Sequence, residues 1–305
     1  MTPFWLGLNL PWLDYGVDFG KNAWQPDGGL AAFPSRRARL EGTFSALADK
    51  GWRVLRWFLL CDGRAGVRFS PRGDPQGLDD RVFADVDQGL SLARAHGLQV
   101  MLTVLDFHWF DKARTVDGVR LGGNARTVSN AGLRARLLDS VLAPLFTRYA
   151  GEPAVWGWDL CNEPEWAVKR VSAGRASVSP GAMRAFLSES AALAHGLVKQ
   201  PVTVGLASVR GLDLVTGIGL DFYQAHWYDS VEATAPLAAP VAGLALDRPL
   251  ILGEYPTKGS ERKPSAIVAT ARDAGWSAAL AWSVLAQDPA TDFAALDVDP
   301  TVQRA

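Results

Sequence analysis

Residues 80–105 read DRVFADVDQGLSLARAHGLQVMLTVL, and this stretch decides the fold. The first part, Asp80–His96, has a helical pattern of apolar and polar residues. His96 is followed by Gly97, and a His in a last turn with Gly just beyond it indicates a helix C-terminus. The apolar run Gln99–Leu105 then predicts a strand. A helix that leads into such a strand is typical of a parallel β/α repeat.

The same alternation continues along the 305 residues of the chain. We expect strands near Phe4–Leu8, Arg53–Leu59, Gln99–Leu105, Ala154–Leu160, Val202–Leu206, Phe222–Trp227, Leu250–Gly253 and Ala279–Val284. We expect helices near Ser35–Lys50, Asp80–His96, Asn130–Tyr149, Pro180–Lys199, Val231–Leu246 and Pro264–Ala274. Alternating strands and helices imply right-handed crossovers and a parallel sheet. Eight strands favour a closed (β/α)8 TIM barrel, and we predict one domain over residues 1–305.

Long loops are predicted after the first four strands, and a short end after the last. The Gly- and Pro-rich stretches Gly16–Pro34, Asp62–Leu78, Asp111–Val128 and Ala167–Ser179 each follow a predicted strand. In a barrel they lie at the carboxyl-terminal rim, where barrel enzymes carry their active sites. Only about 20 residues follow the eighth strand, so the last helix should be short or missing.

Composition excludes several classes of function. The chain is 48% hydrophobic and 21% charged with a net charge of −1, so neither nucleic acid nor an anionic membrane is expected as a partner. No apolar run approaches the roughly 20 residues that span a bilayer. We expect a cytoplasmic protein, although a chain without its signal peptide would look the same. Two cysteines, Cys61 and Cys161, indicate neither a zinc site nor a disulfide framework.

Polar residues gather at the predicted carboxyl-terminal ends of the strands. They are Asn9, Arg56, Asp106, His108, Asn162, Glu163, His226, Tyr228, Glu254 and Trp282. A barrel core favours Val, Ile and Leu, so charged groups at these points need a reason. Of the four His residues, His96 and His195 fall at predicted helix ends and the other two fall in this set. This concentration predicts a functional site at the barrel mouth.

Two glutamates at strand ends suggest a chemistry. Glu163 ends the fourth predicted strand in WDLCNEP, and Glu254 ends the seventh in LILGEYP. Cleavage of a glycosidic bond with retention needs two carboxyl groups about 5–5.5 Å apart, one protonated and one ionised. Glu165 is a rival for the acid, but Pro164 separates it from the strand, so we expect it at the loop base or on the rim.

These motifs carry a family resemblance. The chain resembles the clan A retaining glycoside hydrolases, and among them the cellulase-type glycoside hydrolase family 5. In that family the Glu of Asn-Glu-Pro after strand four is the acid/base and the Glu of Gly-Glu after strand seven is the nucleophile. The matching residues run over almost the whole chain: Asn162-Glu163-Pro164, Gly253-Glu254, Arg56 on strand two, His108 after strand three, His226-Trp227-Tyr228 after strand six and Trp282 on strand eight.

The resemblance and the chemistry assign roles to the other residues. Arg56 and Tyr228 are expected to hold Glu254 ionised, and His226 is expected to position Glu163. Asn162 and His108 would bind sugar hydroxyls, and Trp282 would form an apolar floor. Arg56 as a core ion pair, His108 as a satisfied strand-end His and Trp282 as core packing remain open alternatives. The chain has 12 Trp, and each of the following is either a platform for a further sugar or part of the core: Trp12, Trp24, Trp57, Trp109, Trp166 and Trp227.

The sequence therefore predicts a retaining β-glycoside hydrolase. The resemblance implies β-glucosidic or β-mannosidic oligosaccharides and polysaccharides as substrates. A transglycosylase with the same two glutamates and a catalytically silent carbohydrate-binding barrel remain open. No His-x-x-x-His or Glu-x-x-His pattern and no phosphate-binding loop occur, so neither a metal nor a cofactor is expected. The sequence carries no signal of oligomeric state.

Overall fold

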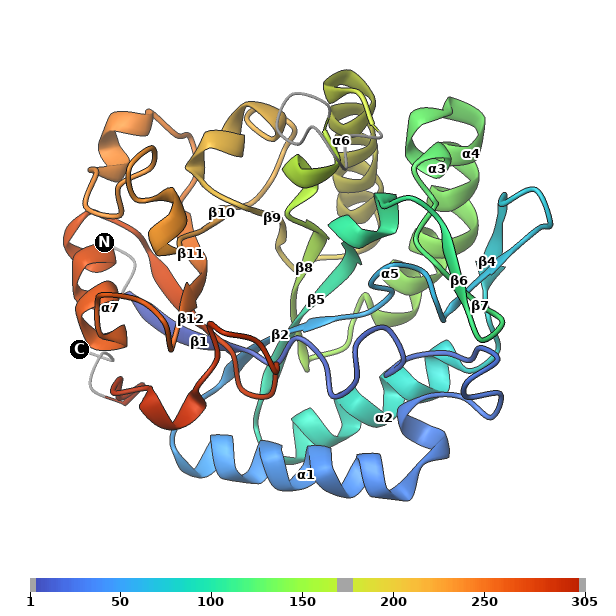
Figure 1. The fold of residues 1–305 in the computed structure, drawn as a ribbon, viewed down its shortest axis with the longest axis horizontal. Helices are drawn as coiled ribbons and strands as arrows, with labels where there is room; N and C mark the ends of the chain where they lie inside the picture. The colour runs from blue at the N-terminus through green and yellow to red at the C-terminus, as the bar shows by residue number, and fades with distance from the viewer. Residues whose placement is uncertain (1–3, 169–177, 302–305) are drawn as a thin grey trace.

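The chain folds into a closed barrel of eight parallel strands. The computed structural model describes residues 4–168 and 178–301. The strands form a ring with the helices outside it (Figure 1). In chain order the barrel strands are β1 (Trp5–Asn9), β2 (Val54–Phe58), β5 (Gln99–Asp106), β8 (Val155–Asn162), β9 (Val202–Leu206), β10 (Tyr223–His226), β11 (Leu250–Pro256) and β12 (Ala278–Trp282). Each pairs in parallel with its chain neighbour and β12 closes on β1, which confirms the predicted fold class.

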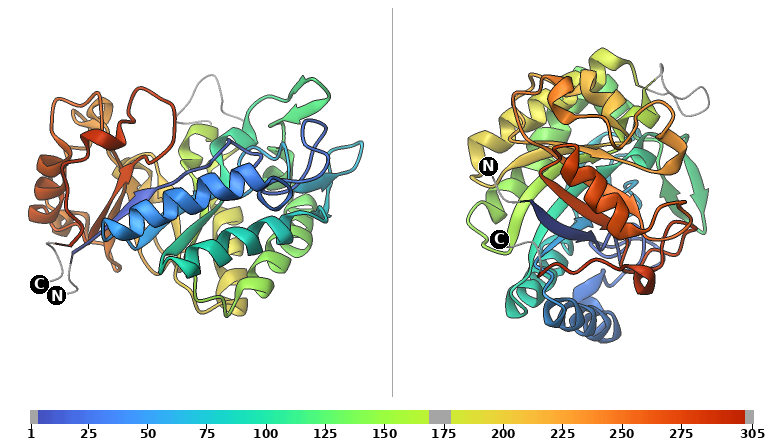
Figure 2. Two further views of the ribbon diagram at one scale, coloured as in Figure 1. Left: turned by 90° about the horizontal axis from the view of Figure 1, so that it is seen from below. Right: turned by 90° about the vertical axis from the view of Figure 1, so that its left-hand side faces the viewer.

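Five of the six predicted helices form. They are α1 (Pro34–Asp49), α2 (Val82–Ala95), the run α3 (Arg126–Ser129), α4 (Ala131–Leu137), η3 (Leu138–Leu142) and α5 (Ala143–Tyr149), then α6 (Pro180–Leu197) and α7 (Pro264–Asp273). In Figure 2, α1 and α2 pack side by side on the outside of the barrel. None of the helices in the described part of the chain has the length and apolar composition needed to cross a membrane.

The predicted helix Val231–Leu246 is wrong. The structure has only two short 3₁₀ turns here, η6 (Asp229–Val231) and η7 (Val241–Leu244). Pro236 and Pro240 interrupt the segment, and a proline inside a helix removes a backbone donor and clashes with the preceding turn. The predicted helix Pro180–Lys199 ends slightly earlier in the structure, at Leu197.

The rim loops contain elements that the helical and strand patterns did not reveal. The loop after β2 carries the hairpin β3 (Val67–Phe69) and β4 (Pro75–Leu78), and the loop after β5 carries β6 (Arg114–Val116) and β7 (Val119–Leu121). Most of the predicted loop Ala167–Ser179 lies outside the described residues. After β12 the described chain has only the 3₁₀ turn η8 (Phe293–Ala295), as expected for a missing last helix.

The barrel interior changes from apolar to polar along its axis. One apolar cluster contains Met101, Ile251 and Leu280, whereas a buried polar layer contains Arg56, Asp159 and Gln224. Two strand glycines make room for these polar side chains. A Cβ on Gly253 would lie 2.4 Å from the Gln224 Cγ, and one on Gly205 would lie 2.8 Å from an Arg56 guanidinium nitrogen. Close packing against Gln224 therefore explains why a glycine precedes Glu254.

A buried carboxylate on α2 helps to hold the loop after β1 in place. Asp85 on α2 is 1% exposed and accepts hydrogen bonds from the backbone N–H groups of Gly20, Gly29 and Ala31 at 2.7–2.9 Å. A carboxylate that accepts three backbone donors satisfies groups that a loop of this length would otherwise bury unpaired. The loop carries Tyr15, which reaches the barrel mouth.

We predict that Asp85→Asn destabilises the protein by about 1–3 kcal/mol, because the amide nitrogen cannot accept from a backbone donor that is left buried. Urea unfolding of the wild type and the variant measures this difference. Asp27→Asn is the matched control, since Asp27 lies exposed in the same loop. Equal losses in the two variants would contradict the account of Asp85.

Candidate active site

A cleft of about 1010 Å³ opens at the carboxyl-terminal ends of the barrel strands. Six of the eight predicted site residues line it: His108, Asn162, Glu163, Tyr228, Glu254 and Trp282. The other two, Arg56 and His226, are 0% and 1% exposed and contact residues of the cleft from beneath. The structure therefore brings all eight predicted residues into one site.

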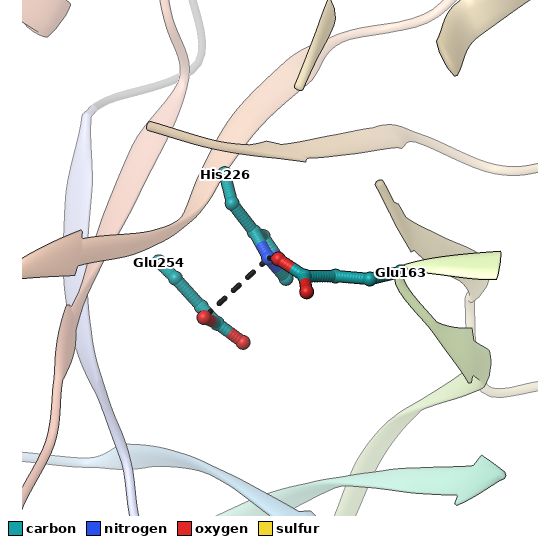
Figure 3. Close-up of side chains that lie close together, drawn as sticks. All are labelled: Glu163, His226 and Glu254. Atoms are coloured by element: carbon teal, nitrogen blue, oxygen red, sulfur yellow. Dashed lines mark hydrogen bonds and ion pairs between the residues drawn. The ribbon is translucent and has the colours of Figure 1, made fainter. Parts of the chain in front are cut away.

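Glu163, His226 and Glu254 form the centre of the cleft. They approach one another from β8, β10 and β11 (Figure 3). One oxygen of each carboxyl and one ring nitrogen of His226 lie within 4.8 Å of one another. This upper bound on the separation of the nearest carboxyl oxygens suits a retaining pair, at ~5–5.5 Å, better than an inverting pair, at ~6.5–9.5 Å. The same three groups also satisfy the spacing of a metal site.

Glu254 is held by a cation and a hydroxyl. The Arg56 Nη1 donates to Oε1 at 2.6 Å, and the Tyr228 hydroxyl donates to Oε2 at 2.8 Å. Burial raises the pKa of the Glu254 carboxyl above its ordinary value, while the Arg56 cation and the Tyr228 hydroxyl act in the opposite direction. The ionised form of Glu254 therefore depends on these neighbours.

Arg56 joins four strands at the base of the cleft. Besides Glu254, the guanidinium donates to Asp159 at 2.9 Å, to Asn162 Oδ1 at 2.7 Å and to Asn9 Oδ1 at 3.0 Å. Burial lowers the pKa of the Arg56 guanidinium, but Asp159 and Glu254 outweigh this effect and raise it. The guanidinium therefore stays charged, and it fixes the orientation of the side chains that accept its hydrogen bonds.

His226 is a neutral imidazole at neutral pH. Burial lowers its pKa to about 4, although Glu254 and Asp159 oppose the shift. The ring Nδ1 lies 2.9 Å from Glu163 Oε1 and 3.4 Å from Glu254 Oε2, and Nε2 has no hydrogen-bond partner among the described residues. Because Nδ1 faces two carboxyls, we place the proton on Nδ1, from which it is donated to Glu163.

Asn162 is oriented from both ends of its amide. Its Oδ1 accepts from Arg56, and its Nδ2 donates to Asp106 Oδ1 at 3.0 Å. The second N–H of Nδ2 remains available to a ligand in the cleft. Asp106 is buried in turn and accepts from the Tyr15 hydroxyl at 2.5 Å.

Three residues support the site in roles that the sequence did not predict. Asp159 contacts Arg56, Asp106 accepts from Asn162, and Tyr15 donates to Asp106. Asp106 was among the polar strand-end residues but had no assigned role, whereas Asp159 and Tyr15 were not assigned to the site. A signal existed for Asp159, because it is a lone acidic residue within the apolar strand β8. Tyr15 lies in a loop without periodicity, and its sequence gives no comparable signal.

His108 and Trp282 form opposite kinds of surface in the cleft. The His108 Nδ1 lies 2.6 Å from Asp111 Oδ2, and its side chain is 37% exposed. Trp282 is 9% exposed, its Nε1 donates to Asp288 at 2.9 Å, and Trp12 packs edge-on against its ring. His108 therefore offers a polar contact to a ligand, and Trp282 offers an apolar ring face of fixed orientation.

Of the six candidate Trp platforms, Trp12 and Trp166 line the cleft. Trp57, Trp109 and Trp227 are buried in the core, which confirms the alternative of a core role for these three. Each has an indole N–H that donates within the protein.

Glu165 is not the rival of Glu163. It is 4% exposed and does not line the cleft. Burial raises the pKa of its carboxyl to about 8, so it is protonated at neutral pH. The expectation that it lies at the loop base is confirmed by this burial.

Comparison with known proteins places the chain beside β-mannanases. No model of a protein family matches the chain. It is 24% identical over 324 residues to the mannan endo-1,4-beta-mannosidase of Mytilus edulis, over 92% of this chain and 83% of that protein. The solved endo-1,4-beta-mannanase from Eisenia fetida has a TM-score of 0.78 at 22% identity, over 96% and 89% of the two chains.

A second solved structure agrees with the first. The beta-1,4-D-mannanase from Cryptopygus antarcticus has a TM-score of 0.79 at 18% identity, over 95% of this chain and 86% of that chain. These similarities confirm the barrel fold and the resemblance to glycoside hydrolases that the strand-end motifs predict.

We predict that Tyr228→Phe raises the pKa of Glu254 by about one unit, because the ionised carboxyl loses a donor. A ¹³C NMR titration of carboxyl-labelled glutamate measures this shift, with the Glu254 signal identified by its loss in Glu254→Gln. Tyr223→Phe is the control, because the Tyr223 hydroxyl donates to Asp247, away from the cleft. An unchanged Glu254 titration in Tyr228→Phe would show that the hydroxyl does not stabilise the carboxylate.

Proposed function

We propose that the chain is a retaining glycoside hydrolase that cleaves internal β-1,4 linkages of mannan. The observation that carries this proposal is the unequal environment of two carboxyls that lie close together. Glu254 contacts a permanent cation and a hydroxyl donor, whereas Glu163 accepts hydrogen bonds from uncharged donors, a neutral imidazole and an indole N–H. Environments that separate the protonation states of two carboxyls assign one as the acid and the other as the nucleophile.

The reaction proceeds in two displacements. Glu254 attacks the anomeric carbon while Glu163 gives its proton to the glycosidic oxygen, so the C–O bond breaks and the leaving sugar departs as an alcohol. Glu163 then removes a proton from water, and the resulting nucleophile attacks the same carbon and releases Glu254. Arg56 and Tyr228 stabilise the carboxylate before attack and again when it leaves.

Mannan is the substrate that the relatives favour. The curated protein and the two solved structures described above are all named as mannanases acting on β-1,4 linkages. Asn162 lines the cleft, and we expect the second N–H of its Nδ2 to donate to the 2-hydroxyl of the reacting sugar. Mannose and glucose differ at this carbon, so the contact is a point at which the two sugars are distinguished.

The function is tested with β-mannan, β-glucan and a panel of aryl β-glycosides and β-diglycosides, using the wild type and Glu163→Gln. We expect turnover of the mannan substrates, unaffected by EDTA, and a loss of at least about 100-fold in kcat/KM for mannan in the variant. Glu165→Gln is the matched control, since Glu165 lies outside the cleft and is protonated at neutral pH. Binding of mannan without turnover by the wild type would favour the silent carbohydrate-binding barrel.

Glu254→Ala tests the nucleophile. We expect turnover to be abolished, because no covalent intermediate forms without the carboxylate. Added azide should fit the vacated space and restore turnover of an activated aryl β-mannoside, giving the α-glycosyl azide as the inverted product. Wild-type rates in Glu254→Ala would show that the assignment is wrong. Product analysis at high acceptor concentration separates hydrolysis from transglycosylation.

A further inference from the structure

Trp166 lies beside Glu163 because of the turn that follows β8. Residues Pro164–Ala167 form a 3₁₀ turn, η4, in which residues three apart lie on the same side. The Trp166 backbone N–H donates to the Glu163 carbonyl at 3.1 Å, and the indole Nε1–H donates to the Glu163 Oε2 at 2.9 Å. Two hydrogen bonds therefore tie Trp166 to the proposed acid/base.

The two carboxyl oxygens of Glu163 face different surroundings. Oε1 lies against His226, which is 1% exposed, so this oxygen points into the protein. Oε2 lies against Trp166, which is 38% exposed and lines the cleft. The oxygen that delivers a proton must be reachable from bound substrate, which identifies Oε2 as the working oxygen.

Trp166 contacts the acid and extends into a space that the nucleophile does not reach. It lines the cleft together with Glu163 and Glu254, and it also lines a second cavity of about 280 Å³, to which Ser208 and Arg210 contribute and Glu254 does not. The acid of a glycosidase sits at the glycosidic oxygen, between the reacting sugar and the leaving group. The part of the cleft beyond the acid is therefore the part that receives the leaving sugar.

We propose that Trp166 is a positioning residue for Glu163 and that its exposed indole face binds the sugar of the leaving group. This inference rests on the proposed function. The Nε1–H holds Oε2 and stabilises the carboxylate that remains after proton transfer. The apolar ring face stacks on the C–H groups of the sugar. A sugar bound here shields the Trp166–Glu163 hydrogen bond from solvent water. Substrate binding and the positioning of the acid therefore depend on the same side chain.

Two variants separate the two roles. Trp166→Phe keeps an aromatic face and removes the N–H, whereas Trp166→Ala removes both. Trp24→Phe is the control, because Trp24 is 42% exposed and does not line the cleft. The measurement is kcat and KM against pH for mannopentaose and for an aryl β-mannobioside, with thermal unfolding to compare the folded state of each variant.

In both Trp166 variants we expect the basic limb of the kcat/KM profile to move upward by about one pH unit, because ionised Glu163 loses a donor. Only Trp166→Ala should raise KM for mannopentaose, by about three- to tenfold, with little change for the aryl substrate. An unmoved basic limb, or an equal loss on both substrates, would overturn the inference and leave the proposed function intact. A wild type that hydrolyses neither substrate would overturn both.

Discussion

The buried guanidinium of Arg56 is the interaction on which the barrel mouth depends. It has no access to water and donates to side chains of β1, β8 and β11 at 2.6–3.0 Å. A buried cation that loses a partner is strongly destabilising, so the carboxyls of Asp159 and Glu254 must lie near it. The glycines at 205 and 253 leave the space that this polar layer occupies. The positions of the site side chains follow from this requirement.

Arg56 also makes the two glutamates chemically different. It contacts Glu254 directly, whereas Glu163 contacts the buried His226, whose pKa of about 4 keeps it uncharged. A charged His226 would stabilise both carboxylates and remove the distinction between acid and nucleophile. The neutral ring can instead hold Glu163 by a hydrogen bond without forcing it to ionise. The chemistry proposed here therefore depends on burial as much as on the identity of the residues.

The strand-end positions were predictable because a parallel barrel places them at one rim. Glu163, Glu254 and Tyr228 stood out as polar residues where apolar strands end, and the structure brings them into one cleft. Supporting residues were harder to predict. Asp159 lies within a strand, and Tyr15 lies in a loop whose path is set by the distant Asp85. The wrong helix at 231–246 shows that a helical pattern does not form a helix when prolines remove its backbone donors.

The stereochemistry of the first product tests the central claim most directly, since it depends on the role of Glu254 and not only on turnover. ¹H NMR of mannopentaose hydrolysis, recorded before the products mutarotate, resolves the anomeric signals of the new reducing end. The account predicts that the β-anomer forms first and the α-anomer grows in later by mutarotation. An α-anomer formed first would show inversion, and it would contradict a covalent intermediate on Glu254.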